Sequence, residues 1–416
     1  MNLNEQYNNL LVDGHPFYYN DFDFEGSYLR EATRFLDAYF RHAGKIPLAE
    51  FNCYTPDDNE REIRNKHMVS TYLLGYLIAE NFQLEDDLYI VNTGCPFKYV
   101  WYLICLFHDA GYGLERNEQE LNALRKALSQ KKTEKDKPFR LGRSVIYDFK
   151  KRQKIHSSIW NGHSKLSFSN NRMRRIMDIK DNVQTRKENI DKEIIISQYY
   201  IKHKFVEFAD GTKCNYPTYT SQLINNYFEF RLSDTDNGCI DHGIAGGYIF
   251  FDKMIENYIN CFKEASKEID CDFNNFEFNN KWYCVEQFSI FGYVADCIIA
   301  HNIWNGKNNK DVYRLFGLDC LIGDSYNKIN KTRNPYLFLL ALSDTLEPLK
   351  LFSNRIESDE EILRQISFTF EDEILGISSM NKKIYDIYRS KLNDIEDWLD
   401  LKIIFNDEKN EIKLVI

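Results

Sequence analysis

The chain has 416 residues, of which 43% are hydrophobic and 15% aromatic, with only 19 glycines and 8 prolines. This composition favours a mostly helical globular protein over an all-β chain with many turns, and the length allows two or three structural units. The net charge of −10 argues against binding nucleic acid or anionic membranes through the whole surface.

Two further features bear on cellular location. The N-terminus lacks a basic start followed by an apolar core, and no apolar run approaches the roughly 18 residues of a membrane span. The ten cysteines are scattered singly, without a CxxC pair, which argues against a zinc ribbon or a disulfide framework. We therefore expect a soluble, cytoplasmic protein that does not bind membranes and has reduced thiols.

The first helix of interest is predicted over residues 60–82. Ile63, His67 and Leu74 recur there at helical spacing, so His67 should point along the buried face of an amphipathic helix. A second helix is predicted from about 97 to 109. It is apolar nearly all round and should be deeply buried, yet it ends in two adjacent polar residues, His108 and Asp109.

The next segment differs in charge. Residues 124–187 carry about 19 Lys or Arg against about 5 Asp or Glu, with weak apolar periodicity, as in an exposed insertion. Its cations could bind substrate phosphates, or the segment could simply be a solvated loop. The candidate phosphate-binding residues are Lys150, Lys151, Arg152, Lys154, Arg172, Arg174 and Arg175.

Helical signals return after residue 234. Asp241 is placed to cap a helix with His242 in its first turn, and a helix near 282–304 carries His301 among apolar residues. A third helix, predicted over 335–352, starts with a proline in a favoured first-turn position. It contains Asp344 in an apolar run, where an isolated carboxylate would cost several kcal/mol unless neutralised, paired or bound to a cation.

The last part of the chain changes style. Residues 365–377 alternate apolar and polar side chains as a strand does, residues 382–400 are helical, and residues 401–416 are typical of a β-hairpin. These elements predict a small α/β appendage at the C-terminal end.

The polar residues in apolar helical context form one set. Singly, His67 could be a satisfied core histidine and Asp344 a helix-packing hydrogen-bond partner. A shared centre of one or two divalent metal ions (Mn, Fe, Ni, Co, Zn or Mg) would explain the whole set at once, since imidazole nitrogen and carboxylate oxygen suit such ions. The candidate ligands are His67, His108, Asp109, His242, His301 and Asp344.

The order His, His-Asp, His, His, Asp resembles the HD-domain metal-dependent phosphohydrolase superfamily, over about residues 60–114 and 234–353. The resemblance implies a mostly α fold in which a helical bundle surrounds the metals. It also implies that His67, His108, Asp109 and Asp344 bind one metal, and that Asp109 bridges to a second metal held by His242 and His301.

On this interpretation the chain divides into four parts: a first HD-domain part with an N-terminal extension (1–114), a basic insertion (115–233), a second HD-domain part (234–353) and the α/β appendage (354–416). Two divalent ions about 3.5–4 Å apart can activate a water for phosphoester hydrolysis. We therefore expect a hydrolase with His108 and Asp109 at its catalytic centre.

The expected substrate is a phosphorylated small molecule, such as a nucleotide or cyclic nucleotide, or a nucleic-acid phosphodiester. Two other functions stay open at this stage. The same residue order also resembles di-iron HD-domain oxygenases of the inositol oxygenase type. Alternatively, the chain could be a nucleotide-binding sensor or regulatory protein, with the C-terminal appendage as its partner module.

Overall fold

A computed structural model describes the two ends of the chain and several segments between them. The described residues are 1–14, 16–17, 29, 32–42, 58–112, 205–216, fourteen separate positions between 223 and 254, 287–303, 310–321, 328–352 and 358–416.

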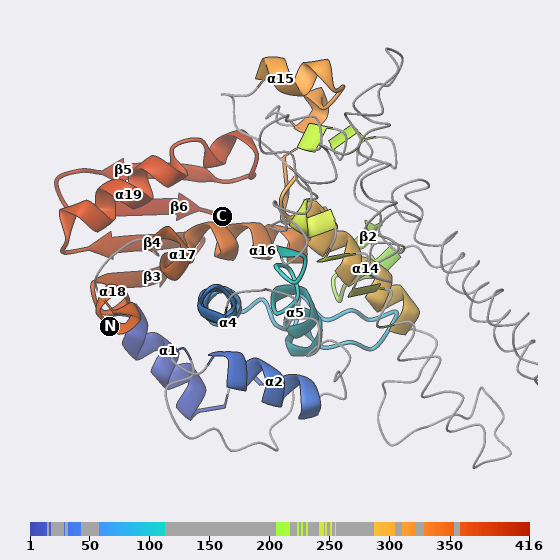
Figure 1. The fold of residues 1–416 in the computed structure, drawn as a ribbon, viewed down its shortest axis with the longest axis horizontal. Helices are drawn as coiled ribbons and strands as arrows, with labels where there is room; N and C mark the ends of the chain where they lie inside the picture. Colours follow the sequence, from blue (N-terminus) through green and yellow to red (C-terminus); the bar gives the residue numbers. More distant parts are fainter. Residues whose placement is uncertain are drawn as a thin grey trace, which may run out of the picture.

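Four helices pack together at the centre of the fold: α4 (Asp58–Asn81), α5 (Phe97–Cys105), α14 (Gln287–Ala300) and α16 (Pro335–Leu346). Figure 1 looks down the axis of α4, with α5 and α16 beside it. The contact between α4 and α5 is close because position 75 is glycine: a Cβ there would lie 2.1 Å from the Trp101 ring. The indole nitrogen of Trp101 donates to the Tyr72 carbonyl at 2.9 Å.

The central helices differ from the sequence predictions in three places. Helix α4 is buried on all sides from residue 67 to residue 79, rather than on one face, and Ile63 is 51% exposed. Helix α5 ends at Cys105, so His108 and Asp109 lie in the following turn. The predicted helix 335–352 is broken at Glu347, because the residue before a proline is disfavoured in helical conformation; α17 (Pro348–Leu351) then begins anew.

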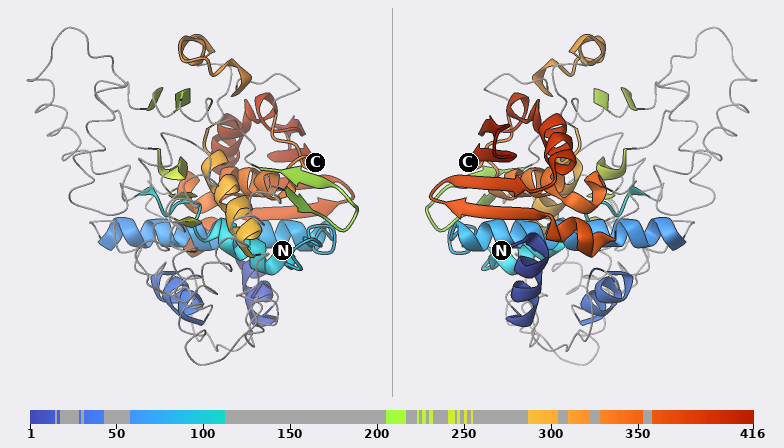
Figure 2. Two further views of the ribbon diagram at one scale, coloured as in Figure 1. Left: turned by 90° about the vertical axis from the view of Figure 1, so that its right-hand side faces the viewer. Right: turned by 90° about the vertical axis from the view of Figure 1, so that its left-hand side faces the viewer.

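Two N-terminal helices cover the side of α4 that faces away from α16. These are α1 (Leu3–Val12), which begins with a capping box formed by Asn2 and Glu5, and α2 (Ala32–His42). The Tyr7 hydroxyl of α1 donates to the carbonyl of Ser70 in α4 at 3.1 Å. Figure 2 shows α4 along its length, between these helices and the C-terminal sheet.

The C-terminal part forms an antiparallel sheet with strand order β3-β4-β6-β5. Its elements are α18 (Asp359–Arg364), β3 (Ile366–Glu371), β4 (Ile374–Ser379), α19 (Lys382–Leu392), the 3-10 helix η6 (Ile395–Asp397), β5 (Lys402–Asn406) and β6 (Glu411–Val415). The hairpin predicted for residues 401–416 is confirmed as β5 paired with β6. The Tyr388 hydroxyl donates to the Leu346 carbonyl at 2.9 Å, which joins α19 to α16.

The remaining elements are short: β1 (Phe205–Glu207) paired with β2 (Lys213–Asn215), helix α15 (Lys310–Leu315) and the 3-10 helix η5 (Asp319–Leu321). The described residues are thus mainly helical with a small β part, as the composition predicts. None of the helices in these ranges has both the length and the hydropathy needed to cross a bilayer.

Candidate metal centre

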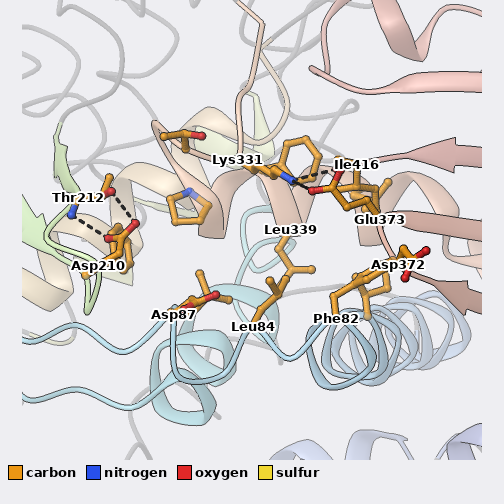
Figure 3. Close-up of a pocket in the computed structure, with 17 residues that line it drawn as sticks. Phe82, Leu84, Asp87, Asp210, Thr212, Lys331, Leu339, Asp372, Glu373 and Ile416 are labelled. Atoms are coloured by element: carbon orange, nitrogen blue, oxygen red, sulfur yellow. Dashed lines mark hydrogen bonds and ion pairs between the residues drawn. The ribbon is translucent and has the colours of Figure 1, made fainter.

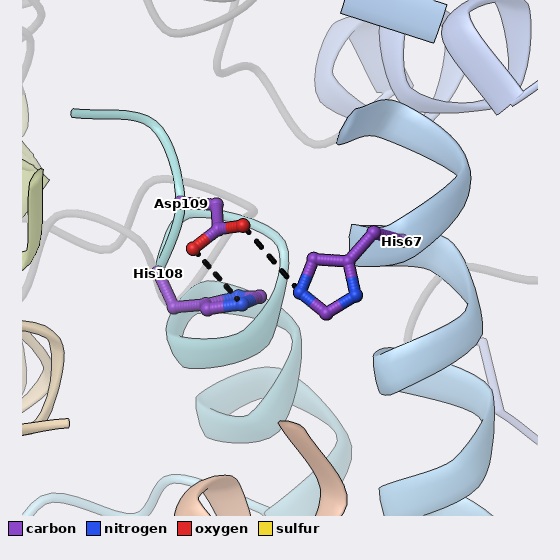
Figure 4. Close-up of side chains that lie close together, drawn as sticks. All are labelled: His67, His108 and Asp109. Atoms are coloured by element: carbon purple, nitrogen blue, oxygen red, sulfur yellow. Dashed lines mark ion pairs between the residues drawn. The ribbon is translucent and has the colours of Figure 1, made fainter. Parts of the chain in front are cut away.

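The Asp109 carboxylate lies at the centre of four histidines. Its Oδ2 is 3.4 Å from His67 Nε2, and its Oδ1 is 3.3 Å from His108 Nε2. The same Oδ1 is 3.5 Å from His242 Nε2 and 3.9 Å from His301 Nε2. Figure 4 shows His67 and His108 with their rings directed at the carboxylate.

The sixth predicted ligand joins this cluster from α16. Asp344 Oδ1 lies 2.9 Å from His67 Nε2 and 3.5 Å from His108 Nε2. Two atoms that are each about 2.0–2.2 Å from one metal ion lie about 3.0–3.5 Å apart in common coordination geometries. The separations of 2.9–3.5 Å around Asp344 and Asp109 therefore suit metal ligation, and only that between Asp109 and His301, at 3.9 Å, is longer.

Within the described part of the chain, the buried ligands form two trios that share Asp109: one with His67 and His108, the other with His242 and His301. In each trio the candidate ligand atoms lie within 4.8 Å of one another. This arrangement is the one expected from the sequence, in which Asp109 lies between two adjoining metal sites. The seven basic residues predicted between 150 and 175 to bind phosphate lie outside the described residues.

Hydrogen bonds fix which nitrogen of three imidazoles faces the cluster. The Nδ1 atoms of His108 and His301 lie 2.6 Å from the carbonyl oxygens of Cys105 and Ile298. Because a carbonyl only accepts, each Nδ1 carries a hydrogen, so Nε2 is the nitrogen left to bind a metal. A carboxylate does the same for His67, as described below.

The Glu347 carboxylate holds the third imidazole. Its Oε2 lies 2.7 Å from His67 Nδ1, and Glu347 is fully buried. Its two oxygens also accept from the backbone N–H groups of Leu349 and Lys350 at 2.7 and 2.8 Å, which caps α17. A carboxylate behind a histidine is the usual outer partner of a metal-bound imidazole.

Four buried atoms at the centre have no partner with hydrogen-bond geometry: His67 Nε2, His108 Nε2 and both carboxylate oxygens of Asp109. A buried polar atom left without a partner costs about 1–3 kcal/mol, and such atoms are rare in native proteins. Here they converge on one place and combine imidazole nitrogen with carboxylate oxygen donors. The residues therefore fit a bound divalent cation.

The protonation states agree with such a donor set. Burial, with His242 and His108 nearby, lowers the pKa of His301 to about 3, so this imidazole is neutral. Burial opposes ionisation of Asp109 and Asp344, but Lys350 and the neighbouring histidines hold the pKa of both carboxyls below the usual range. Both aspartates are therefore anionic.

His67 is the exception among the imidazoles. Burial and Lys350 act against its protonation, but the neighbouring carboxylates of Asp344, Glu347 and Asp109 raise the pKa of His67 to about 9. Without a metal ion this ring carries a second proton at pH 7. A bound cation at Nε2 would take the place of that proton.

Two cations border the centre, and neither was predicted from the sequence. Arg64 Nη1 lies 3.7 Å from Asp109 Oδ2, and its guanidinium stacks 3.6 Å above the Tyr112 ring. Lys350 Nζ lies 3.1 Å from Asp344 Oδ1. The side chains of Arg64 and Lys350 are 16% and 37% exposed, so both reach solvent at the edge of the buried cluster.

Sequence signals for these neighbours exist but are weak. Arg64 precedes His67 by three residues, which places both on one face of α4. Glu347 follows Asp344 by three residues, in the same apolar run. Tyr112, whose ring stacks on His242 at 3.8 Å between centroids, had no signal.

Close backbone packing brings the two trios together. A Cβ at position 111 would lie 2.0 Å from the carbonyl oxygen of His242. Only glycine therefore allows the turn after Asp109 to approach the helical turn that carries His242. As predicted, Asp241 caps this helix, with its Oδ1 accepting from the N–H of Ile244 at 3.0 Å. Its Oδ2 accepts from Asn302 Nδ2 at 2.9 Å, which ties the segments carrying His242 and His301.

Comparisons with known proteins add no relative: no family model, no curated protein and no solved structure matches the chain. The functional argument therefore depends on the geometry of the cluster.

Proposed function

We propose that the chain is a metal-dependent phosphohydrolase related to the HD-domain superfamily. The observation that carries the proposal is the convergence of six residues from five segments around Asp109, where four buried donor atoms of His67, His108 and Asp109 lack a hydrogen-bond partner. Their order along the chain, His, His-Asp, His, His, Asp, supports the resemblance to the HD-domain superfamily. On this proposal His67, the His108–Asp109 pair and Asp344 would hold one ion. His242 and His301 would hold a second ion, with Asp109 shared between the two.

The metals would supply one part of the chemistry: two divalent ions acidify a water molecule and polarise a phosphoryl group. The protein supplies the rest. Glu347 keeps the proton of His67 on Nδ1, and backbone carbonyls do the same for His108 and His301. The burial of these donors excludes competing bulk water.

The charges of the surrounding residues favour an anionic substrate. Asp109, Asp344 and Glu347 are countered by Arg64, Lys350 and the protonated His67, so the metal-free site is close to neutral. Two divalent ions would make it clearly positive. With the aspartates engaged by metal, the Arg64 guanidinium and Lys350 ammonium could bind phosphate oxygens at the exposed edge.

The test combines metal analysis with a substrate panel. Protein loaded separately with Mn²⁺, Co²⁺, Zn²⁺, Ni²⁺, Mg²⁺ or Fe²⁺ is offered bis(p-nitrophenyl) phosphate, nucleotides, cyclic nucleotides and single-stranded oligonucleotides. We expect hydrolysis of at least one phosphoester, lost on changing His108 and Asp109 together to Ala. Asp319→Ala, an exposed carboxylate of η5 (61% exposed), is the matched control and should keep full activity.

The same test separates the other two functions. The histidine and carboxylate donors also suit two irons. Oxygen consumption by the ferrous protein, without turnover of any phosphoester, would replace the hydrolase proposal by an oxygenase. Stabilisation by nucleotide without any turnover would favour a sensor protein.

A further inference from the structure

A cavity lies apart from the candidate metal centre. Its volume is about 530 Å³, within the range of about 300–1,000 Å³ that is usual for small-molecule sites. It opens between the C-terminal end of α4, the β1–β2 hairpin, the first turns of α16 and the β3–β4 turn (Figure 3). None of its 17 lining residues is a predicted metal ligand. Along α4, His67 and the lining residue Ile78 are separated by about 16 Å, at 1.5 Å per residue.

The floor of the cavity is apolar. It is formed by residues that are at most 4% exposed and that come from α4, α16, the α4–α5 connection and the β1–β2 turn: Ile78, Leu88, Phe208, Phe338, Leu339 and Leu342. The partly buried side chains of Phe82 and Leu84 extend this surface. A ligand with an apolar or aromatic body would fill the space above the buried floor and take the exposed parts of Phe82 and Leu84 out of water, which favours binding.

The rim of the cavity is acidic. Asp87, Asp210, Asp372 and Glu373 line it, and Lys331 is the one basic side chain among the described lining residues. The Lys331 ammonium is already engaged: it lies 3.6 Å from Glu373 Oε1 and donates to the Ile416 carbonyl at 2.9 Å. The remaining three carboxylates give the mouth an excess of negative charge.

Two of these carboxylates stand on opposite sides of the apolar floor. Figure 3 shows Leu339 between the side that carries Asp210 and the side that carries Asp372. The Asp210 carboxylate is held in place by the backbone N–H and the hydroxyl of Thr212, both at 2.8 Å. An anionic ligand would be repelled at this mouth, and a cationic one would be attracted.

We propose that this cavity binds an organic cation: a small molecule with an apolar or aromatic body that covers the floor and an ammonium group that pairs with the rim carboxylates. The proposal is independent of the metal centre, since no residue is shared. It is therefore tested on the metal-free 416-residue chain, where failure of the metal site has no bearing on the result.

The experiment uses three probes with one indole ring and different charge: tryptamine (cation), tryptophol (neutral) and indole-3-propionate (anion). Binding is measured by calorimetry and by saturation-transfer NMR. We expect tryptamine to bind about three- to tenfold more tightly than tryptophol, the range that one or two exposed ion pairs provide, and indole-3-propionate to bind most weakly.

Variants locate the binding. Changing Asp210 and Asp372 together to Asn, at two exposed positions that leave the floor intact, should reduce the preference for tryptamine over tryptophol to less than about twofold. Leu339→Trp should fill the floor and abolish binding of all three probes. Asp319→Asn, an exposed carboxylate outside the lining, is the matched charge control and should change nothing.

Three results would overturn the proposal. The first is no saturable tryptamine binding below about 1 mM, an affinity of only about 4 kcal/mol. The second is equal binding of the three probes. The third is a preference for tryptamine that survives the Asp210 and Asp372 replacements. Because these replacements are at the surface, they decide the matter even if Leu339→Trp fails to fold.

Discussion

Changing Glu347 to Gln tests whether this buried carboxylate orients a metal-binding imidazole. Its oxygens accept three hydrogen bonds: from His67 Nδ1 at 2.7 Å, from the N–H of Leu349 at 2.7 Å and from the N–H of Lys350 at 2.8 Å. Glutamine keeps the shape but offers one accepting oxygen, so its NH₂ group must face at least one of these donors.

The magnitude follows from those contacts. Loss of one capping bond of α17 costs about 1 kcal/mol. Replacing a charge-assisted bond to His67 by a neutral one costs about 1 kcal/mol more. We therefore expect the free energy of unfolding to fall by about 2 kcal/mol, and the affinity for metal to fall about 10- to 100-fold, the usual effect of losing an outer carboxylate partner.

The matched control is Glu361→Gln. Glu361 also caps a helix, accepting from the N–H of Ser358 at 2.8 Å at the start of α18, but it is exposed and contacts no predicted metal ligand. This variant should lose some stability and keep its metal affinity. Urea unfolding and competition with a fluorescent chelator measure the two quantities. Unchanged metal affinity in Glu347→Gln, beside a normal stability loss, would refute the orienting role.

Three other predictions concern the residues around the same centre. Lys350→Met and Arg64→Ala should each lower kcat/KM for a phosphoester about tenfold or more, because each removes a charge-assisted contact to phosphate. The metal content, measured by mass spectrometry, should stay unchanged. A parallel loss of metal would show that Lys350 and Arg64 hold the site together rather than bind phosphate. Gly111→Ala should displace the backbone of His242, because the new Cβ would lie 2.0 Å from the His242 carbonyl oxygen. Calorimetry should then show a lower metal stoichiometry than in the control Gly211→Ala, at an open position with positive φ. Equal stoichiometry in the two variants would contradict the close-packing argument. Metal affinity should rise about tenfold for each pH unit between 6.5 and 9. The reason is that the pKa of His67 is raised to about 9, so the metal must displace a proton from His67 over this interval. A flat profile between these pH values would show that His67 binds no metal.

The sequence predicted the six polar residues of the cluster because each stands out against apolar neighbours. Asp344 in its leucine-rich run and the His108–Asp109 pair after an apolar helix are conspicuous without any knowledge of their partners. The prediction of mainly helical structure and of the C-terminal hairpin succeeded for a similar reason, since periodicity and turn residues are local signals.

Helix ends and pairing partners were harder to predict. The turn that holds His108 and Asp109 packs closely against the helical turn of His242. This contact joins distant parts of the chain, so no local sequence pattern predicts it. Glu347 lies 280 residues from His67, so their hydrogen bond leaves no local pattern. The organic-cation cavity has no signal either, because its floor and rim come from segments between residues 78 and 416.

The most direct test of a shared metal centre is a metal count on the purified protein. Inductively coupled plasma mass spectrometry of the protein after loading and removal of free metal should find one or two tightly held divalent ions per chain. The His108→Ala, Asp109→Ala double variant should hold none, and the Asp319→Ala control should match the wild type. A wild-type protein without retained metal, or a double variant that retains the full amount, would contradict the account.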